Sequence, residues 1–212
     1  MKLFSSRKII EMKEKDVIIK RFVSSPNETN TYLVIEGNEA AVIDIANSYD
    51  EVRGTLNELA ISLKYLLVTH GHPSHLGSIR MTKENLGGML CLHECDADLL
   101  KEAGSNLEPE IFLTDKSSLK LGDTVIKVLH TPGHTLGSLC FHVIKAEALF
   151  TGDTLLKGEF GKIKGPHSMG LMLRSLKRLN SAIPPKTTIY PGHGPITTMS
   201  KEAWLNALDN LS

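Results

Sequence analysis

The chain has 212 residues, which suits one domain with a sizeable core. Its 24 lysine and arginine residues balance 24 aspartate and glutamate residues, so charge gives no reason to expect DNA, RNA or an anionic membrane as a partner, and we expect a small-molecule substrate. Charged residues interrupt the first 20 positions, and no long apolar run follows. Three cysteines are too few for a disulfide framework, so we expect a cytoplasmic protein; the sequence does not predict its oligomeric state.

The first part of the chain predicts short strands followed by alternating helices and strands. β-Branched and apolar runs indicate the strands, with a turn at Gly37-Asn38 between two of them. Apolar residues at helical spacing indicate the helices, and Gly87-Gly88 is expected to end the second helix. The predicted strands are residues 17–23, 31–36, 40–45, 65–68 and 89–92, and the predicted helices are residues 51–63 and 76–86.

Three histidines, His70, His72 and His75, lie within six residues directly after the strand predicted over 65–68. Histidine is the commonest neutral metal ligand, and two imidazoles separated by one residue can converge on one ion once the chain leaves a strand. Packing is a poor explanation for such clustering. The segment therefore predicts a metal site.

The second part of the chain repeats the plan of the first. Its predicted strands are residues 125–129, 138–144, 148–150 and 187–190, and its predicted helices are residues 171–179 and 201–211. We therefore expect a single domain over residues 1–212, with two similar halves at roughly 16–110 and 111–212. Two such halves fit an αββα sandwich, in which two sheets pack face to face and helices cover the outside.

Three further segments each place a possible ligand in a tight turn or at the end of an apolar run. These ligands are His134, Asp153 and His193. Glycine or proline lies next to each of them and fixes an unusual backbone path, so that the histidine or aspartate points in a defined direction.

In order and spacing, these four segments closely resemble the metallo-β-lactamase superfamily and, within it, the hydroxyacylglutathione hydrolase (glyoxalase II-like) branch. The family motif is His-x-His-x-Asp-His, followed by a lone histidine, a bridging aspartate and a final histidine. The matching positions here are His70, His72, Ser74, His75, His134, Asp153 and His193. The resemblance extends from about residue 16 to the C-terminus and implies a four-layer αββα sandwich of the metallo-β-lactamase type, with the metal between the two halves.

The resemblance also implies a centre for one or two zinc ions, with iron as an alternative metal. A divalent ion with such ligands lowers the pKa of bound water from about 15.7 to near 7 and polarises a carbonyl. Metal-bound hydroxide is then the expected nucleophile, and no serine or cysteine nucleophile is required. The implied first site is His70, His72 and His134 with Asp153 shared, and the implied second site is Ser74, His75, Asp153 and His193.

Ser74 departs from the family pattern, which has aspartate at this position. A neutral hydroxyl is a much weaker ligand than a carboxylate, and its presence leaves one more positive charge in the site, so the second ion is expected to bind weakly or not at all. Serine would also suit the N-cap of the helix predicted over 76–86. The change removes the usual group that orients hydroxide, and no catalytic residue is assigned, although Asp153 and His193 are possible helpers.

These features predict a metal-dependent hydrolase of a small thioester or ester. One alternative is a mononuclear iron protein resembling persulfide dioxygenases, because His70, His134 and Asp153 could form a facial triad of two histidines and one carboxylate. Another is a metal-binding protein with little turnover. The chain lacks the Gly-Arg-x-Asp element and the C-terminal helical domain of full-length glyoxalase II, which makes that specific activity less expected.

Several other polar residues have two interpretations. Asp44 is either a hydrogen-bond acceptor near the metal or an ordinary turn carboxylate. Cys91, His93 and Cys95 alternate and could share one strand face as a second metal site, but packing is the favoured explanation. Lys162 and Lys164 either meet a substrate carboxylate or are solvated loop lysines. The remaining histidines, expected to be structural or exposed, are His130 in a turn, His142 in a strand and His167 in a loop.

Overall fold

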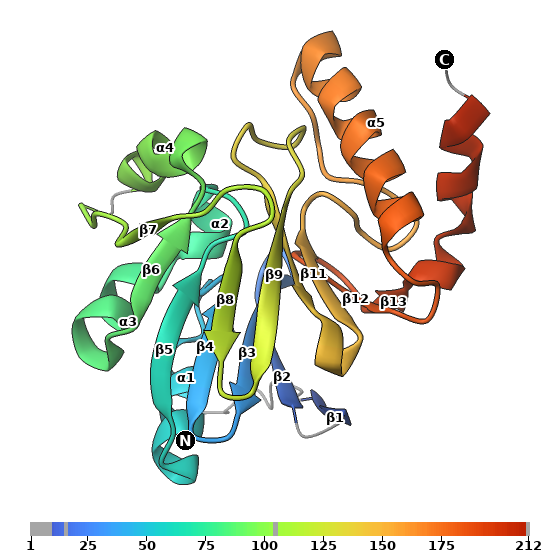
Figure 1. Ribbon diagram of the computed structural model, residues 1–212. Coiled ribbons are helices and arrows are strands. Elements are labelled where there is room, and N and C mark those ends of the chain that lie inside the picture. The colour runs from blue at the N-terminus through green and yellow to red at the C-terminus, as the bar shows by residue number, and fades with distance from the viewer. Residues whose placement is uncertain (1–9, 15–16, 104–105, 211–212) are drawn as a thin grey trace.

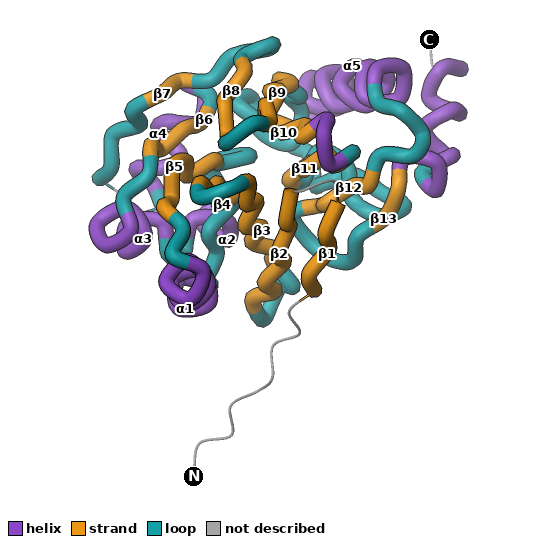
Figure 2. Tube along the Cα trace, turned by 60° about the horizontal axis from the view of Figure 1, so that its bottom comes forward, coloured by secondary structure: helices purple, strands orange, loops and turns teal. Residues whose placement is uncertain are grey.

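The computed structural model describes residues 10–14, 17–103 and 106–210. Two β-sheets pack face to face, and helices lie on the outer side of each sheet (Figures 1 and 2). Within the described residues, the strands of the first sheet, in order, are β1 (Ile10–Glu14), β2 (Val17–Ser24), β3 (Thr29–Glu36), β4 (Glu39–Ile43), β5 (Ser62–Leu67), β6 (Met89–Leu92) and β7 (Ile111–Phe112). Those of the second sheet are β13 (Thr197–Thr198), β12 (Thr188–Pro191), β11 (Ala148–Gly152), β10 (Leu139–Val143), β9 (Thr124–His130) and β8 (Ser118–Leu121).

Helices connect the strands and cover the sheets. The α-helices are α1 (Tyr49–Leu59), α2 (Pro73–Leu76), α3 (Ile79–Leu86), α4 (Ala97–Glu102) and α5 (Gly165–Ala182). The 3-10 helices are η1 (Glu94–Asp96), η2 (Ile144–Ala146), η3 (Met199–Lys201) and η4 (Ala203–Asn210). Figure 2 shows α1 and α3 beside the first sheet and α5 beside the second.

Three apolar clusters account for the layers. The first fills the space between the sheets and includes Val34 and Phe141. The second lies between the first sheet and α1 and α3, where Leu56 is buried. The third lies between the second sheet and α5, where Leu176 is buried. Because each sheet is apolar on both faces, each needs a partner layer on both sides, and the predicted four-layer αββα sandwich is confirmed.

Strand direction brings the candidate ligands to one edge of the sandwich. Strands β4 to β7 are parallel, and β11 is parallel to β12, while β9 reaches the same direction through the antiparallel β10. The carboxyl ends of parallel strands share one edge, where loops gather polar groups. The loops after β4, β5, β9, β11 and β12 carry the residues identified above.

Two of the predicted helices have different limits in the structure. The helix predicted over 51–63 ends at Leu59, because Ala60 adopts a left-handed conformation with φ of 52° and residues 62–67 form β5. The helix predicted over 76–86 is two helices, since the N–H of Ser78 donates to the carbonyl of Ile45 instead of continuing the turn. The prediction that Ser74 caps this helix is wrong: α2 begins at Pro73, and its N-cap is His72.

In the second half, α5 begins at Gly165, six residues before the predicted start, so His167 lies in a helix and not in a loop. The helix predicted over 201–211 is a 3-10 helix as far as the described residues extend. Strand β7 belongs to the first sheet, so that sheet extends past residue 110. Among the strands and α-helices of the described residues, those that the sequence did not predict are β1, α4, β7, β8 and β13.

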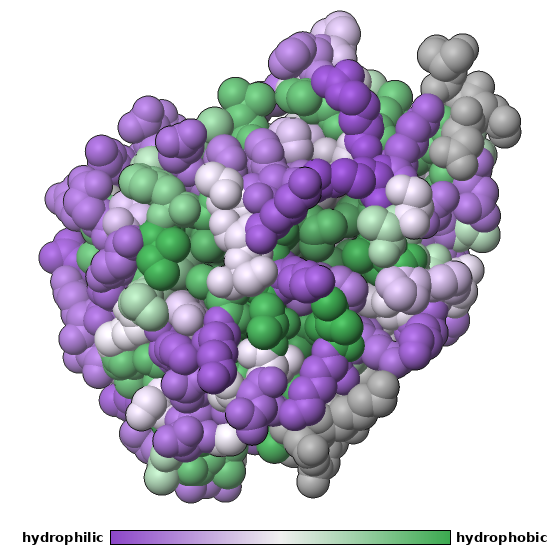
Figure 3. Space-filling model, in the orientation of Figure 1, coloured by the Kyte–Doolittle hydropathy of each residue, from purple (hydrophilic) through white to green (hydrophobic). Residues whose placement is uncertain are grey.

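No helix in the described part of the chain is long and apolar enough to cross a lipid bilayer. The face drawn in Figure 3 mixes hydrophilic and hydrophobic side chains, and the hydrophobic ones gather in several small areas. The exposed apolar side chains include Val125, Leu136 and Ile144. Scattered apolar residues of this kind are normal at a protein surface.

Candidate metal centre

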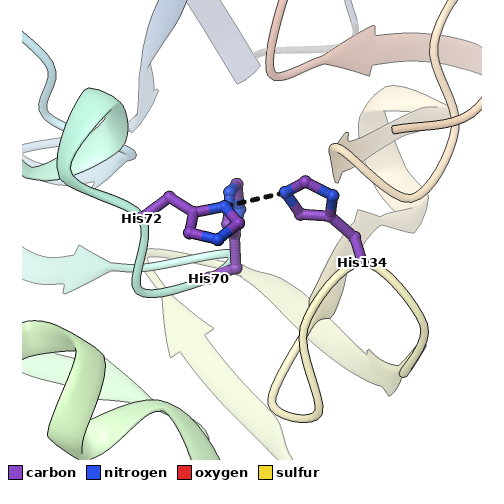
Figure 4. Close-up of side chains that lie close together, drawn as sticks. All are labelled: His70, His72 and His134. Atoms are coloured by element: carbon purple, nitrogen blue, oxygen red, sulfur yellow. Dashed lines mark hydrogen bonds between the residues drawn. The ribbon is translucent and has the colours of Figure 1, made fainter. Parts of the chain in front are cut away.

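His70, His72 and His134 form the first histidine cluster. Figure 4 shows their rings turned toward one another, with His70 and His72 on the loop after β5 and His134 on the loop after β9. One ligand nitrogen from each lies within 4.8 Å of the others. Two loops that are 60 residues apart in sequence are therefore joined at this point, as the family motif implies.

Hydrogen bonds set the proton positions in this cluster. The Nδ1 atom of His134 lies 2.6 Å from the carbonyl oxygen of Lys162, so it must carry the proton and donate it. Its Nε2 atom faces Nδ1 of His72 at 2.8 Å. His70 is 1% exposed, and its Nε2 atom has no hydrogen-bond partner in the described part of the chain.

His75, Asp153 and His193 form the second cluster, again with ligand atoms within 4.8 Å of one another. The Nε2 atoms of His75 and His193 are 3.1 Å apart. Asp153 lies between the two clusters: its Oδ2 atom is 3.4 Å from Nε2 of His134 and 3.6 Å from Nε2 of His193. One carboxylate is therefore within reach of both groups of nitrogens.

The donor set fits a bound cation. His75 donates its Nδ1 proton to Asp44, and His193 donates its own to the carbonyl of Asn27. When both rings are neutral, their two Nε2 lone pairs face each other at 3.1 Å. Two facing lone pairs repel, and a cation between them turns the contact into attraction. Oδ1 of Asp153 is also buried without a hydrogen-bond partner among the described residues. Imidazole and carboxylate ligands suit zinc and iron.

Asp44 is not an ordinary turn carboxylate. It is 2% exposed and has a positive φ of 53°, a conformation that few residues other than glycine adopt. Its oxygens accept hydrogen bonds from the backbone N–H of Thr69 at 2.8 Å, the Thr69 hydroxyl at 2.6 Å and Nδ1 of His75 at 3.0 Å. It thus orients His75 and the residue that precedes His70, which supports the first of the two interpretations.

The pKa values of the buried histidines follow from these contacts. Burial, together with the neighbouring histidines, holds the pKa of His70 well below its usual value. Burial and His134 lower the pKa of His72 in the same way. Both rings are therefore neutral near pH 7, the form that binds metal. Burial acts to lower the pKa of His75 too, but Asp44 outweighs it and raises this pKa.

Ser74 is partly buried in the first turn of α2, one residue before His75. Its backbone position follows Pro73, and no side-chain hydrogen bond caps the helix. The second cluster, as defined by its three ligand groups, contains a single carboxylate, that of Asp153. With serine at position 74, a second divalent ion in this cluster would therefore have one carboxylate fewer than the family pattern provides.

Cys91, His93 and Cys95 do not share a strand face, so the structure favours the packing explanation over a second metal site. Strand β6 ends at Leu92, so the alternation of side chains stops before His93. The Cys91 thiol donates to the carbonyl of Met89, His93 stacks on His130 with ring centroids 4.1 Å apart, and Cys95 is exposed.

The remaining candidates lie outside the two clusters. His142 is partly buried in β10, where burial lowers its pKa. The side chains of Lys162 and Lys164 are exposed, and Lys162 reaches the centre through its backbone carbonyl.

Backbone carbonyls are the contacts that sequence inspection missed. The carbonyls of Asn27 and Lys162 fix the rings of His193 and His134, and a carbonyl leaves no mark on the sequence. The turn that carries His193 is held by Asn30, which donates to the carbonyl of Pro191 at 2.7 Å, and by Tyr32, which donates to the same oxygen at 2.7 Å. Both residues lie on β3, so a strand of the first sheet holds this turn of the second sheet.

Comparison with known proteins agrees with this geometry. A sequence profile of the Metallo-beta-lactamase superfamily matches residues 25–211. A hydroxyacylglutathione hydrolase of Pelagibacter ubique (strain HTCC1062) is 34% identical over 183 residues, covering 85% of this chain and 72% of the relative. A probable polyketide biosynthesis zinc-dependent hydrolase of Bacillus subtilis (strain 168), PksB, is 30% identical over 169 residues, covering 78% and 73%. The crystal structure of TTHA1623 in a di-iron-bound form superposes with a TM-score of 0.74 at 30% identity, covering 85% of this chain and 95% of the other. The chain belongs to the metallo-β-lactamase superfamily.

Proposed function

We propose that this protein is a metal-dependent hydrolase of a small thioester or ester. The observation that carries the proposal is the pair of imidazole Nε2 atoms facing each other at 3.1 Å beside Oδ1 of Asp153, which has no hydrogen-bond partner among the described residues. Two neutral imidazoles repel each other in this arrangement, and a bound cation removes the repulsion. The residues that would hold a first ion are His70, His72, His134 and Asp153, and those that would hold a second are His75, His193 and Asp153.

A divalent ion held here would supply Lewis acidity, which polarises a carbonyl and makes water a nucleophile near neutral pH. The chain's own contribution is orientation. In the neutral rings, Asp44 and the carbonyls of Asn27 and Lys162 keep the protons of three histidines on Nδ1, which leaves the Nε2 lone pairs for a cation. Asp153 and His193, whose side chains are 11% and 24% exposed, are the groups that we propose for handling protons at the site.

The names of the relatives support the reaction class. One is a hydrolase of hydroxyacylglutathione and another a zinc-dependent hydrolase of polyketide biosynthesis. For this chain we propose a small-molecule thioester or ester and a cytoplasmic location. Lys162 and Lys164, exposed next to the loop that holds His134, are the groups we propose for an anionic part of the substrate.

The second candidate function is an iron-dependent oxygenation like that of persulfide dioxygenases. His70, His134 and Asp153 supply two imidazoles and a carboxylate, the ligand set of non-haem iron sites. The di-iron form of TTHA1623 favours keeping this candidate. A third outcome, metal binding with little turnover, follows from Ser74, because the usual orienting carboxylate is missing at that position.

Turnover of metal-reconstituted protein separates the candidates. Protein stripped with chelator and reloaded with zinc or with iron should be offered S-acylglutathione and simple acyl thioesters, and the released thiol measured. We expect thiol release by the zinc form of the wild type and of His167→Ala, an exposed histidine outside both clusters, and none by His72→Ala. Oxygen consumption with a persulfide by the iron form alone would support the second candidate, and binding without either reaction would support the third.

A further inference from the structure

Asp96 is a buried carboxylate that touches both halves of the first histidine cluster. It ends η1 and stands at the N-cap of α4, yet its side chain makes no capping hydrogen bond to that helix. It is 1% exposed. Among the described residues, no lysine or arginine forms an ion pair with it. A buried charge without a counter-ion is unfavourable unless hydrogen bonds satisfy it.

Three donors satisfy this carboxylate, and all three come from the loops that carry the histidines. The backbone N–H of Gly71 donates to Oδ2 at 2.9 Å, and the hydroxyl of Thr135 donates to the same oxygen at 2.8 Å. The backbone N–H of Gly137 donates to Oδ1 at 2.8 Å. Gly71 lies between His70 and His72, and Thr135 directly follows His134.

The two glycines allow this close approach. A Cβ atom at Gly71 would lie 2.5 Å from the Cβ of Leu99, and one at Gly137 would lie 2.5 Å from Oδ1 of Asp96. A larger residue at either position would push the loop away from the carboxylate. Glycine at both positions therefore lets the two histidine loops approach the start of α4 closely enough to bind the Asp96 carboxylate.

We infer that Asp96 is a positioning residue for the metal centre: its carboxylate fixes the loop of His70 and His72 against the loop of His134. The inference rests on the proposed function, since it concerns the same first site. One loop belongs to each half of the sandwich, so the spacing of the three ligand nitrogens depends on a contact that crosses between the halves. A preorganised ligand set binds metal more tightly than one that must be assembled.

Asp96→Asn tests this inference, because asparagine keeps the size of the side chain but puts an amide donor opposite an N–H or hydroxyl donor. The matched control is Asp98→Asn, an exposed carboxylate in the same helix. Metal-free proteins should be titrated with zinc against a chromophoric chelator, with circular dichroism as the check of folding and the visible absorption of the cobalt form as the readout of ligand geometry. We expect zinc affinity to fall by about 10–100-fold in folded Asp96→Asn, with an altered cobalt spectrum, and to stay unchanged in Asp98→Asn.

Wild-type zinc affinity and an unchanged cobalt spectrum in folded Asp96→Asn would overturn the inference. If Asp96→Asn does not fold, Thr135→Val decides, because it removes one donor and leaves the carboxylate. A smaller fall in zinc affinity supports the inference, and wild-type affinity overturns it. Absence of zinc binding by the wild type itself is a distinct result, which would overturn the proposed metal centre and this inference with it.

Discussion

Asp44→Asn tests whether one buried carboxylate sets the proton position on His75. Asp44 offers acceptors to Thr69 twice, at 2.8 and 2.6 Å, and to Nδ1 of His75 at 3.0 Å. Asparagine has one acceptor oxygen and one amide donor, so at least one of these donors loses its acceptor. If the amide faces His75, it favours the tautomer with the proton on Nε2, the atom that faces His193.

The magnitude follows from the lost contacts. A hydrogen bond to a charged acceptor contributes about 1.5–3 kcal/mol, so loss of one or two of the three should cost about 1.5–6 kcal/mol of unfolding free energy in the metal-free protein. The matched control is Asp50→Asn, because the Asp50 side chain is 80% exposed and pairs with Arg53 at 3.3 Å. Exposed pairs on a helix contribute only about 0.2–0.5 kcal/mol, so this control should unfold almost as the wild type does.

The pH dependence of the difference is a sharper test. Burial acts to lower the pKa of His75, but Asp44 raises it overall. A raised pKa means that the ion pair stabilises the fold fully below the pKa of free histidine, about 6.5, and that this contribution is lost as the pH rises through the folded-state pKa. The difference between wild type and Asp44→Asn should therefore be largest near about pH 6 and shrink toward about pH 9. Urea unfolding of chelator-treated proteins measures it, and a difference that grows with pH would refute the reasoning.

Three further predictions follow from the same geometry. Ser74→Asp should raise the zinc content from near one toward two ions per chain, because it adds a carboxylate beside the second cluster. A titration in which the wild type binds two zinc ions with equal affinity would contradict this. Replacing Cys91, Cys95 and Cys140 together by serine should leave metal-dependent turnover intact. Burial raises the pKa of the Cys91 thiol to about 12 and that of the Cys140 thiol to about 11, which makes both poor nucleophiles. Loss of turnover with metal and fold retained would point to a thiol mechanism. Leu176→Ala, on the buried face of α5, should cost about 2–5 kcal/mol of unfolding free energy, and a change below about 1 kcal/mol in denaturant unfolding would contradict the packing described.

The sequence was sufficient for the metal-centre candidates because their signals are local. His70, His72 and His75 stand within six residues at the end of a strand, and the other ligand candidates sit in glycine and proline turns. Strand order then decides that these loops share an edge, and the family resemblance supplied that order. Which ring nitrogen faces the centre depended on carbonyls and on Asp44, and spacing carries no information about such contacts.

The wrong predictions have local physical causes. Ser74 was expected to cap a helix because serine suits that position, but proline is favoured at the first helical residue, and α2 starts at Pro73, one residue before Ser74. The alternation of Cys91, His93 and Cys95, for which packing was the favoured explanation, has no strand to support it after Leu92. Asp96 was not identified at all, because an acidic residue at the start of a helix is typical of a simple cap and its partners lie 25 to 41 positions away in the sequence.

The central claim is that His70, His72 and His134 hold a metal ion. The most direct measurement is the metal content, by elemental analysis, of wild-type protein and His72→Ala purified without added metal and dialysed against a weak chelator, with His167→Ala as the matched control. We predict about one zinc or iron ion per chain in the wild type and in His167→Ala, and a severe loss in His72→Ala, because an incomplete ligand set leaves the ion to water. Wild-type metal content in His72→Ala, or no metal retained by any of the three proteins, would contradict the claim.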